Sequence, residues 1–213
     1  MYTKTWARTE PGSPNVSTPI FIKSAAAPKD FPSDDGCEVA FVGRSNSGKS
    51  TALNLLAGVR KLARVSKTPG RTQLVNFFGV GEQRRLVDLP GYGFARVPPG
   101  TKERWRVLIE AYLTMRRSLV GVIVTMDIRR GVTDLDDALL HWLEPLGLRV
   151  GLLLTKADKL AHGAGVARER EIAERVGRGV ELTRFSALNR TGVDVGRGWI
   201  DGWMQHDAAN AAP

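Results

Sequence analysis

The sequence predicts a three-layer α/β domain in which about six mainly parallel strands lie between helices on both faces. One observation is an alternation of short apolar runs with segments whose apolar residues recur at helical spacing. A second is the glycine-rich stretch GRSNSGKST at residues 43–51, which directly follows the apolar run VAFV. Continuously apolar strands that alternate with helices are typical of parallel sheets buried on both faces.

Six segments have the composition of strands, and several are continuous runs of Val, Ile and Leu, such as GVIVTMDI and RVGLLLTK. They are residues 37–43, 73–81, 83–90, 121–128, 149–156 and 180–187. Order is expected to begin near IFIKSA at residues 20–25, to which no strand is assigned.

Five segments between the strands are expected to be helices. They are residues 48–57, 102–117, 135–146, 166–176 and 191–204. In the second, Trp105, Leu108 and Tyr112 repeat along one helical face. The third begins after Thr133, with Asp136 three residues later, the pattern of a capping box. Four glycines in the last segment disfavour a helix there.

The chain of 213 residues is long enough for one domain with a sizeable core. We predict a flexible extension over residues 1–19, one domain over 20–205, and a flexible tail over 206–213. No apolar run would span a bilayer, the N-terminus lacks the apolar centre of a secretory signal, and Cys37 is the single cysteine. These features predict a soluble cytoplasmic protein with no membrane attachment. We expect a monomer, although the sequence does not determine the oligomeric state.

The net charge of +9 favours an anionic partner, of which nucleic acid is the commonest. The alternative is a basic surface that is merely solvated. Composition leaves both interpretations open.

Residues 43–50, GRSNSGKS, fit the pattern G-x-x-x-x-G-K-[S/T], with a predicted strand before and a predicted helix after. Such a loop turns its backbone N–H groups and a helix N-terminus toward phosphate. Lys49 is expected to reach the β- and γ-phosphates, and the Ser50 hydroxyl to bind Mg²⁺. The phosphate-binding residues would be Gly43, Arg44, Ser45, Asn46, Ser47, Gly48, Lys49, Ser50, Thr51 and, from a later loop, Gly91. The alternative is a glycine-rich turn without a ligand.

Three short motifs follow later strands, where ligands bind in sheets of this kind. In DLPG, Asp88 can hold Mg²⁺ through water, and the N–H of Gly91 can reach the γ-phosphate. In TKAD, Thr155-Lys156-Ala157-Asp158, the carboxylate of Asp158 can accept both donors on the edge of guanine, a pair that adenine lacks. The stem of Lys156 can cover the base. After VELTRF come Ser186 and Ala187, whose N–H can donate to guanine O6. Each motif alone is weak and could be an ordinary strand-ending turn, but their order along the chain is informative.

With these motifs in this order, the chain resembles the translation-factor-related P-loop GTPases of Ras-like fold, and within them the YihA/EngB-type ribosome-biogenesis GTPases. The resemblance rests on FIKSA, EVAFVGRSNSGKS, KTPGRTQLVNFF, DLPGYGFA, and TKAD in place of N-K-x-D. It implies a GTP-binding and GTP-hydrolysing switch that uses Mg²⁺, binds GTP or GDP, and assists assembly of the large ribosomal subunit.

The resemblance also assigns the switch segments. Thr72 would bind Mg²⁺ directly in the GTP state, with Thr68 as the rival. Switch I would include Gly70, Arg71 and Thr72, and switch II would begin with Asp88, Leu89, Pro90 and Gly91. Thr155 replaces an amide that usually braces the phosphate loop, and its hydroxyl can make a shorter bond.

The expected partners are the large ribosomal subunit and its RNA. Candidate RNA-facing residues are Arg60, Lys61, Arg64, Lys67 and Arg71, together with Lys102, Arg104, Arg106, Arg116 and Arg117 on one face of the predicted helix. Two other functions remain open: a GTP-sensing RNA- or ribosome-binding module with negligible hydrolysis, and a P-loop small-molecule kinase.

Tyr92 stands directly after DLPG, where many GTPases place a glutamine that orients the attacking water. We therefore expect slow intrinsic hydrolysis, on the order of 10⁻⁴ to 10⁻³ per second. By resemblance, Asn46 would hold K⁺ beside the phosphates. The alternative role of Asn46 is to brace the loop.

Overall fold

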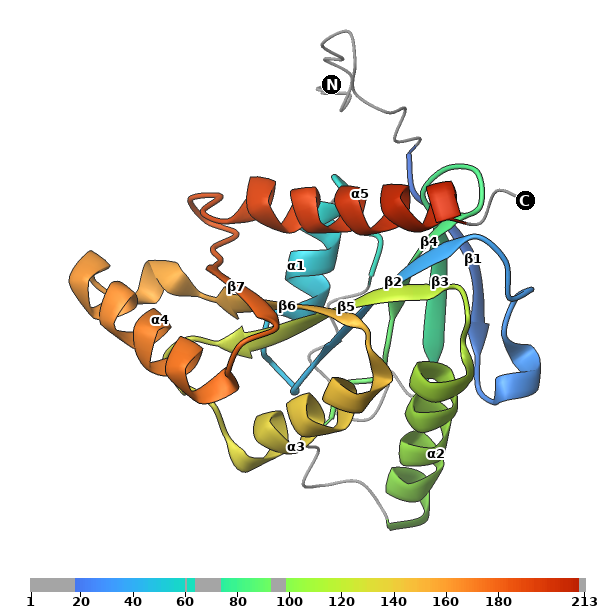
Figure 1. Cartoon of the computed structure of the whole chain (residues 1–213), viewed down its shortest axis with the longest axis horizontal. Helices are drawn as coiled ribbons and strands as arrows, with labels where there is room; N and C mark the ends of the chain where they lie inside the picture. The colour runs from blue at the N-terminus through green and yellow to red at the C-terminus, as the bar shows by residue number, and fades with distance from the viewer. Residues whose placement is uncertain (1–17, 60, 64–73, 93–98, 211–213) are drawn as a thin grey trace, which may run out of the picture.

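The computed structural model describes residues 18–59, 61–63, 74–92 and 99–210. A seven-stranded sheet in the order β1-β3-β4-β2-β5-β6-β7 forms its centre (Figure 1). The strands are β1 (Ile20–Ala25), β2 (Cys37–Gly43), β3 (Val75–Gly79), β4 (Arg84–Asp88), β5 (Leu119–Asp127), β6 (Arg149–Thr155) and β7 (Val180–Arg184). Strands β4, β2, β5, β6 and β7 pair in parallel, whereas β3 runs antiparallel to β1 and β4.

The predicted three-layer α/β class is confirmed, and the sheet has one strand beyond the six that the sequence identifies. The added strand is β1, which pairs with β3 at the edge of the sheet. Its residues Ile20, Phe21 and Ile22 are 65%, 59% and 41% exposed, and its register shifts between Phe21 and Lys23. A short, irregular and exposed edge strand has little periodic signal, because its stability comes from the neighbour with which it pairs.

The five predicted helices are present. They are α1 (Lys49–Leu56), α2 (Pro99–Met115), α3 (Asp134–Leu143), α4 (His162–Val176) and α5 (Val193–Asn210), with 3₁₀ turns at η1 (Pro28–Asp30), η2 (Glu144–Leu146) and η3 (Ala157–Lys159). The capping box of α3 is confirmed, because the Asp136 carboxylate accepts the backbone N–H of Thr133 at 3.0 Å and its hydroxyl at 2.6 Å. No helix in the described ranges is long and apolar enough to cross a membrane.

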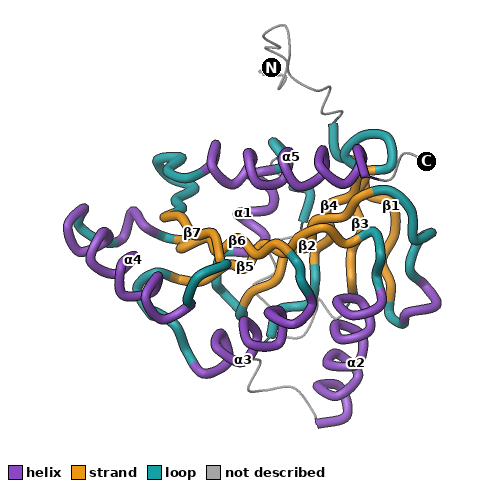
Figure 2. Tube along the Cα trace, in the orientation of Figure 1, coloured by secondary structure: helices purple, strands orange, loops and turns teal. Residues whose placement is uncertain are grey.

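Helices α1 and α5 cover one face of the sheet, and α2, α3 and α4 cover the other (Figures 1 and 2). Each face has its own apolar core. Leu108, Tyr112, Leu143 and Ile172 belong to the core beneath α2, α3 and α4. A second cluster, which includes Leu53 and residues of α5, fills the other side.

Helix α5 forms despite its glycines because its buried face packs closely on the sheet. The parallel rings of Trp199 and Trp203 have centroids 6.3 Å apart. A Cβ atom added at Gly121 would lie 2.3 Å from the Trp203 ring, and one at Gly151 would lie 2.7 Å from the Trp199 ring. Two indoles can therefore rest on the sheet only where β5 and β6 carry glycine, and this burial outweighs the low helix propensity of α5.

A buried ionic cluster joins α2 to the sheet and corrects one prediction. Glu38 is fully buried and accepts hydrogen bonds from Arg116 at 2.6 and 3.0 Å, from Arg85 at 3.0 Å, and from the Tyr112 hydroxyl at 2.9 Å. The expectation that Arg116 faces RNA is wrong, since its side chain is only 5% exposed. The reason is that the buried Glu38 carboxylate holds Arg116 as a cationic partner in addition to Arg85. Arg106 and Arg117 do remain exposed, at 66% and 87%.

Candidate functional site

The glycine-rich segment curves tightly between β2 and α1. Asn46 and Gly48 adopt left-handed conformations, with φ of +64° and +91°. A Cβ atom at Gly43 would lie 2.1 Å from Thr125 Oγ1 and 2.6 Å from Ser47 Oγ, so the position requires glycine. Helix α1 begins at Lys49. The first N–H groups of the helix therefore point into the curve, as the predicted phosphate loop requires.

Two threonines, Thr125 and Thr155, brace this loop from the strands on which it rests. Ser47 Oγ lies 2.7 Å from Thr125 Oγ1, which is fully buried at the end of β5. The Thr155 hydroxyl lies 2.5 Å from the Ser47 carbonyl oxygen and 3.0 Å from the Met126 carbonyl oxygen. Thr155 therefore contacts the loop through a short hydroxyl bond, as expected. The bracing role of Thr125 was missed, although a lone hydroxyl within GVIVTMDI was a signal for it.

The end of β4 lies beside the start of α1, where two of the three predicted metal ligands, Asp88 and Ser50, are found. The Lys49 ammonium contacts the Asp88 carboxylate, which is 3% exposed, and Ser50 is the next residue of α1. A hydroxyl and a carboxylate are oxygen ligands of the kind that Mg²⁺ prefers, so these residues fit that ion. Gly91 follows in a segment held beside the loop by the Tyr92 N–H, which donates to the Gly43 carbonyl at 3.3 Å.

The predicted switch I residues Gly70, Arg71 and Thr72 lie outside the described residues, as do Arg60, Arg64, Lys67 and Thr68. The same holds for residues 93–98 and for the side chains of Lys102, Arg104 and Trp105.

The TKAD and Ser-Ala segments form one unit at the ends of β6 and β7. The hydroxyl of the fully buried Ser186 donates to Asp158 Oδ1 at 2.7 Å, and the Ala157 N–H donates to the Phe185 carbonyl at 3.1 Å. The bond from Ser186 is the main cause that lowers the pKa of Asp158 below its usual value. A carboxylate held ionised and oriented can accept both guanine donors. The sequence placed Ser186 in the site but did not predict this orienting bond.

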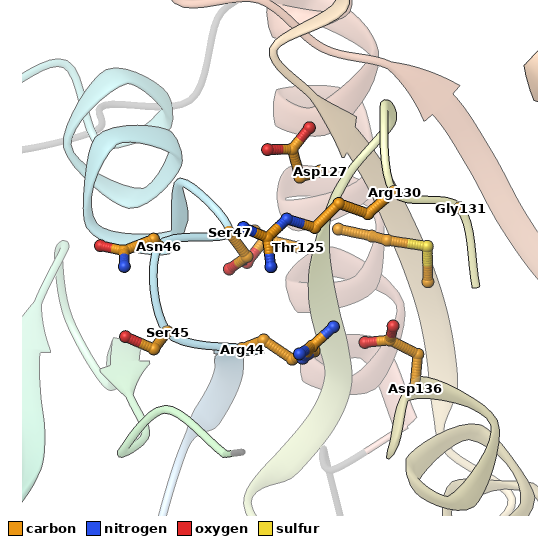
Figure 3. A pocket seen from close by; sticks show the side chains of 10 residues that line it. Arg44, Ser45, Asn46, Ser47, Thr125, Asp127, Arg130, Gly131 and Asp136 are labelled. Atoms are coloured by element: carbon orange, nitrogen blue, oxygen red, sulfur yellow. The ribbon is translucent and has the colours of Figure 1, made fainter. Parts of the chain in front are cut away.

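Lys156 links the TKAD segment to the glycine-rich loop. Its backbone is left-handed, with φ of +59°, and its ammonium donates to the Asn46 carbonyl at 2.7 Å and to Asp127 Oδ2 at 2.9 Å. Figure 3 shows Asp127 beside the loop, where a pocket lies between the loop and the segment that follows β5. Asp127 was not predicted as a site residue; its signal was a carboxylate at the end of a buried strand.

Tyr92 is anchored to α3. Its hydroxyl donates to Oδ1 of the buried Asp136 at 2.6 Å, and Arg44 donates to the Thr133 hydroxyl at 3.3 Å (Figure 3 shows Arg44 directed toward Asp136). Burial, together with the charge of Asp136, raises the pKa of Tyr92 far above its usual value. The phenol therefore stays protonated and donates toward α3.

Comparison with known proteins agrees with this geometry. A family model described as a 50S ribosome-binding GTPase, MMR_HSR1, matches residues 38–156. The chain is 50% identical over 192 residues to the probable GTP-binding protein EngB of Enterobacter sp. (strain 638), covering 89% of this chain and 92% of the relative. It is 43% identical over 190 residues to the probable GTP-binding protein EngB of Coxiella burnetii (strain CbuG_Q212), covering 88% and 93%.

Solved structures share the fold. A crystal structure of a probable GTP-binding protein EngB aligns with a TM-score of 0.62 at 21% identity, covering 80% of this chain and all of that one. Era, solved with MgGDPNP and a segment of 16S ribosomal RNA, aligns with a TM-score of 0.61 at 21% identity, covering 79% of this chain and 57% of that one. The identities to the relatives and the match of the family model together show that the chain belongs to the EngB family of GTP-binding proteins.

Proposed function

We propose that the protein is a GTP-hydrolysing molecular switch that assists assembly of the large ribosomal subunit. The observation that carries the nucleotide part is the convergence of the phosphate loop with Asp158, through Lys156, on one edge of the sheet. The ribosomal part is supported by the description of the matching family and by the net charge of +9.

In this proposal each contact has a separate task. Lys49 binds the β- and γ-phosphates, and the N–H groups at the start of α1 surround them. Ser50 directly and Asp88 through water would hold Mg²⁺, which would neutralise phosphate charge, and Thr72 would be a ligand only when a γ-phosphate is present. Asp158 selects guanine, and Ser186 keeps its carboxylate in place.

Intrinsic hydrolysis is proposed to be slow because Tyr92 is engaged elsewhere. Its hydroxyl donates to Asp136, so it is not free to orient a water at the γ-phosphate. Charge that develops at the transition state must also be neutralised, which is a separate task. Asn46 is the candidate K⁺ ligand for this task through its side-chain oxygen. The alternative is that this side chain braces the loop, whose backbone carbonyl at Asn46 accepts a hydrogen bond from Lys156.

The test combines co-sedimentation and turnover. Large and small ribosomal subunits are mixed with the protein in the presence of a GTP analogue, GDP or no nucleotide, at low and moderate salt. We expect binding to the large subunit that is strongest with the GTP analogue and falls steeply with salt, because several RNA phosphates would be neutralised. Binding that ignores nucleotide or salt would contradict the ribosomal role.

Turnover is measured with and without large subunits, in KCl and in NaCl at constant ionic strength, for wild type and Asn46→Ala. The switch hypothesis predicts slow hydrolysis that subunits accelerate. The second candidate, a GTP-sensing module, predicts nucleotide-dependent binding without acceleration. The anchored Tyr92 favours this second candidate. Potassium should accelerate wild type and not Asn46→Ala; equal rates in sodium would leave Asn46 as a bracing residue.

A further inference from the structure

The carboxylate of Asp127 lies between the two halves of the nucleotide site, at the last residue of β5. Its side chain is 5% exposed. Lys156 Nζ donates to Oδ2 at 2.9 Å, and Arg129 donates to Oδ1 through Nε at 2.9 Å and to Oδ2 through Nη2 at 2.7 Å. The backbone N–H of Arg129 adds a bond to Oδ1 at 3.2 Å. Both oxygens of this carboxylate are therefore committed to cationic or backbone donors.

Such a carboxylate remains charged. Burial by itself would raise the pKa of Asp127, but the hydrogen bonds from Arg129 and Lys156 outweigh it and lower the pKa well below its usual range. A buried carboxylate must keep its cationic partners, because an unpaired charge away from water costs several kcal/mol. The Asp127 carboxylate is thus charged throughout the physiological pH range.

Lys156 has little freedom once this pair is formed. Its backbone occupies the left-handed region, and its second bond goes to the Asn46 carbonyl at 2.7 Å. The ammonium therefore bridges a carboxylate on β5 and a carbonyl of the phosphate loop. Lys156 lies two residues before Asp158, so the same bridge also fixes where the guanine-specifying segment lies relative to that loop.

We propose that Asp127 is a positioning residue for nucleotide binding: it holds Lys156 against the phosphate loop and thereby slows the release of both GDP and GTP. Asp127 acts through Lys156 and does not itself contact the nucleotide. This inference rests on the nucleotide site of the proposed function and is independent of the ribosomal role.

The first measurement is the dissociation rate of fluorescent GDP and GTP analogues from wild type and Asp127→Asn. The amide has the shape of the carboxylate but no charge. We expect release to be about tenfold faster, corresponding to the loss of one modest charge-assisted contact. The increase should be the same for both nucleotides, because Lys156 is placed by the loop carbonyl and not by a γ-phosphate. Unchanged release from a folded Asp127→Asn protein would overturn the proposal.

A double-mutant cycle tests whether Asp127 works through Lys156. Lys156→Met keeps most of the aliphatic stem and removes the ammonium. If the proposal is correct, Asp127→Asn adds nothing to the faster release of Lys156→Met. Additive effects of the two substitutions would contradict it. The proposal would also be contradicted if Arg129→Gln accelerated nucleotide release as much as Asp127→Asn does, because Arg129 contacts the same carboxylate without contacting the loop.

Two further variants separate positioning from a general loss of stability. Asp34 accepts a hydrogen bond from the backbone N–H of Ser118, just before β5 begins and at the end of that strand away from Asp127. Asp34→Asn should lower the melting temperature without changing nucleotide release. Asp127→Glu keeps the charge and should release nucleotide more slowly than Asp127→Asn; the reverse order at equal melting temperatures would count against positioning. Wild type that binds no guanine nucleotide would overturn the nucleotide site as a whole, whereas normal binding with a silent Asp127→Asn would overturn this inference alone.

Discussion

At the scale of single residues, the site depends on polar atoms whose partners are held by burial. Ser186 is fully buried and orients Asp158, and Thr155 is 3% exposed and contacts the Ser47 carbonyl. When a buried hydrogen-bonding group loses its partner, the free energy of unfolding falls by roughly 1–3 kcal/mol. Substitutions that change one atom at such positions should therefore change binding without changing the fold.

Guanine selectivity should depend on the Asp158 carboxylate. In Asp158→Asn, the new amide accepts one hydrogen bond and opposes one of the two guanine donors. Selectivity of GTP over XTP should reverse, because xanthine carries an oxygen in place of the amino group. Sites built on such hydrogen bonds discriminate by about 10⁴ or more. Competition of GTP, ATP and XTP against a fluorescent GDP analogue measures this, and identical rankings for wild type and mutant would refute the role of Asp158.

At the scale of elements, α5 shows how packing selects a helix that composition disfavours. Its buried face carries Trp199, Ile200 and Trp203, whereas Gly198 and Gly202 lie on the exposed face. A Cβ atom at either glycine would meet no atom within 4 Å. These two glycines therefore lower helix stability without serving the contact with the sheet.

Replacing Gly198 and Gly202 by alanine should stabilise the protein. Each substitution is expected to raise the free energy of unfolding by roughly 0.5–1 kcal/mol, because alanine restricts the unfolded chain and favours the helix. Gly196→Ala is the matched control on the buried face, where the new Cβ would lie 3.0 Å from Leu56 Cδ2. Urea unfolding should show a smaller gain or a loss for this control. Equal gains at all three positions would argue against the packing assigned to Gly196.

At the scale of the whole molecule, the candidate nucleotide site and the buried ionic cluster lie at opposite ends of the parallel strands. The chain leaves β2 toward β3 and β4 on one side and toward β5, β6 and β7 on the other, so the phosphate loop lies where the strand order reverses. The carboxyl ends of the parallel strands carry the candidate nucleotide site. The amino ends of β2 and β5 carry the ionic cluster of Glu38, Arg116 and Asp34.

Asp34 in this ionic cluster predicts how the free energy of unfolding depends on pH. Burial acts to raise the pKa of Asp34, but hydrogen bonds from Ser118 and Arg117 and the charge of Arg116 outweigh it and lower the pKa to about 2. A carboxyl whose pKa is lowered in the folded state stabilises the protein at neutral pH and loses that contribution as the pH falls. Asp34 should therefore contribute at most about 2 kcal/mol above pH 4, and this contribution should disappear as the pH approaches 2.

Urea unfolding of wild type and Asp34→Asn between pH 2 and pH 7 tests this. The two should differ most at neutral pH and converge in acid. A difference that stays constant over this range would show that the carboxylate charge at Asp34 does not contribute to stability.

The features that could be predicted from the sequence are those that neighbouring residues specify. The spacing of Gly43, Gly48, Lys49 and Ser50 specifies a loop before a helix N-terminus, and the alternation of apolar runs specifies the α/β class. Backbone conformation and burial period are properties of a few neighbouring residues, so these predictions needed no three-dimensional information.

The contacts between side chains far apart in the sequence could not be predicted in this way. Asp127 and Lys156 are 29 residues apart and Tyr92 and Asp136 are 44 apart, and no local pattern pairs them. Arg116 belongs to the basic face of the predicted helix over residues 102–117, yet in the structure it follows the end of α2 and pairs with the buried Glu38. Pairing of this kind depends on strand order and helix packing, because a buried charge takes whichever partner the fold brings within reach.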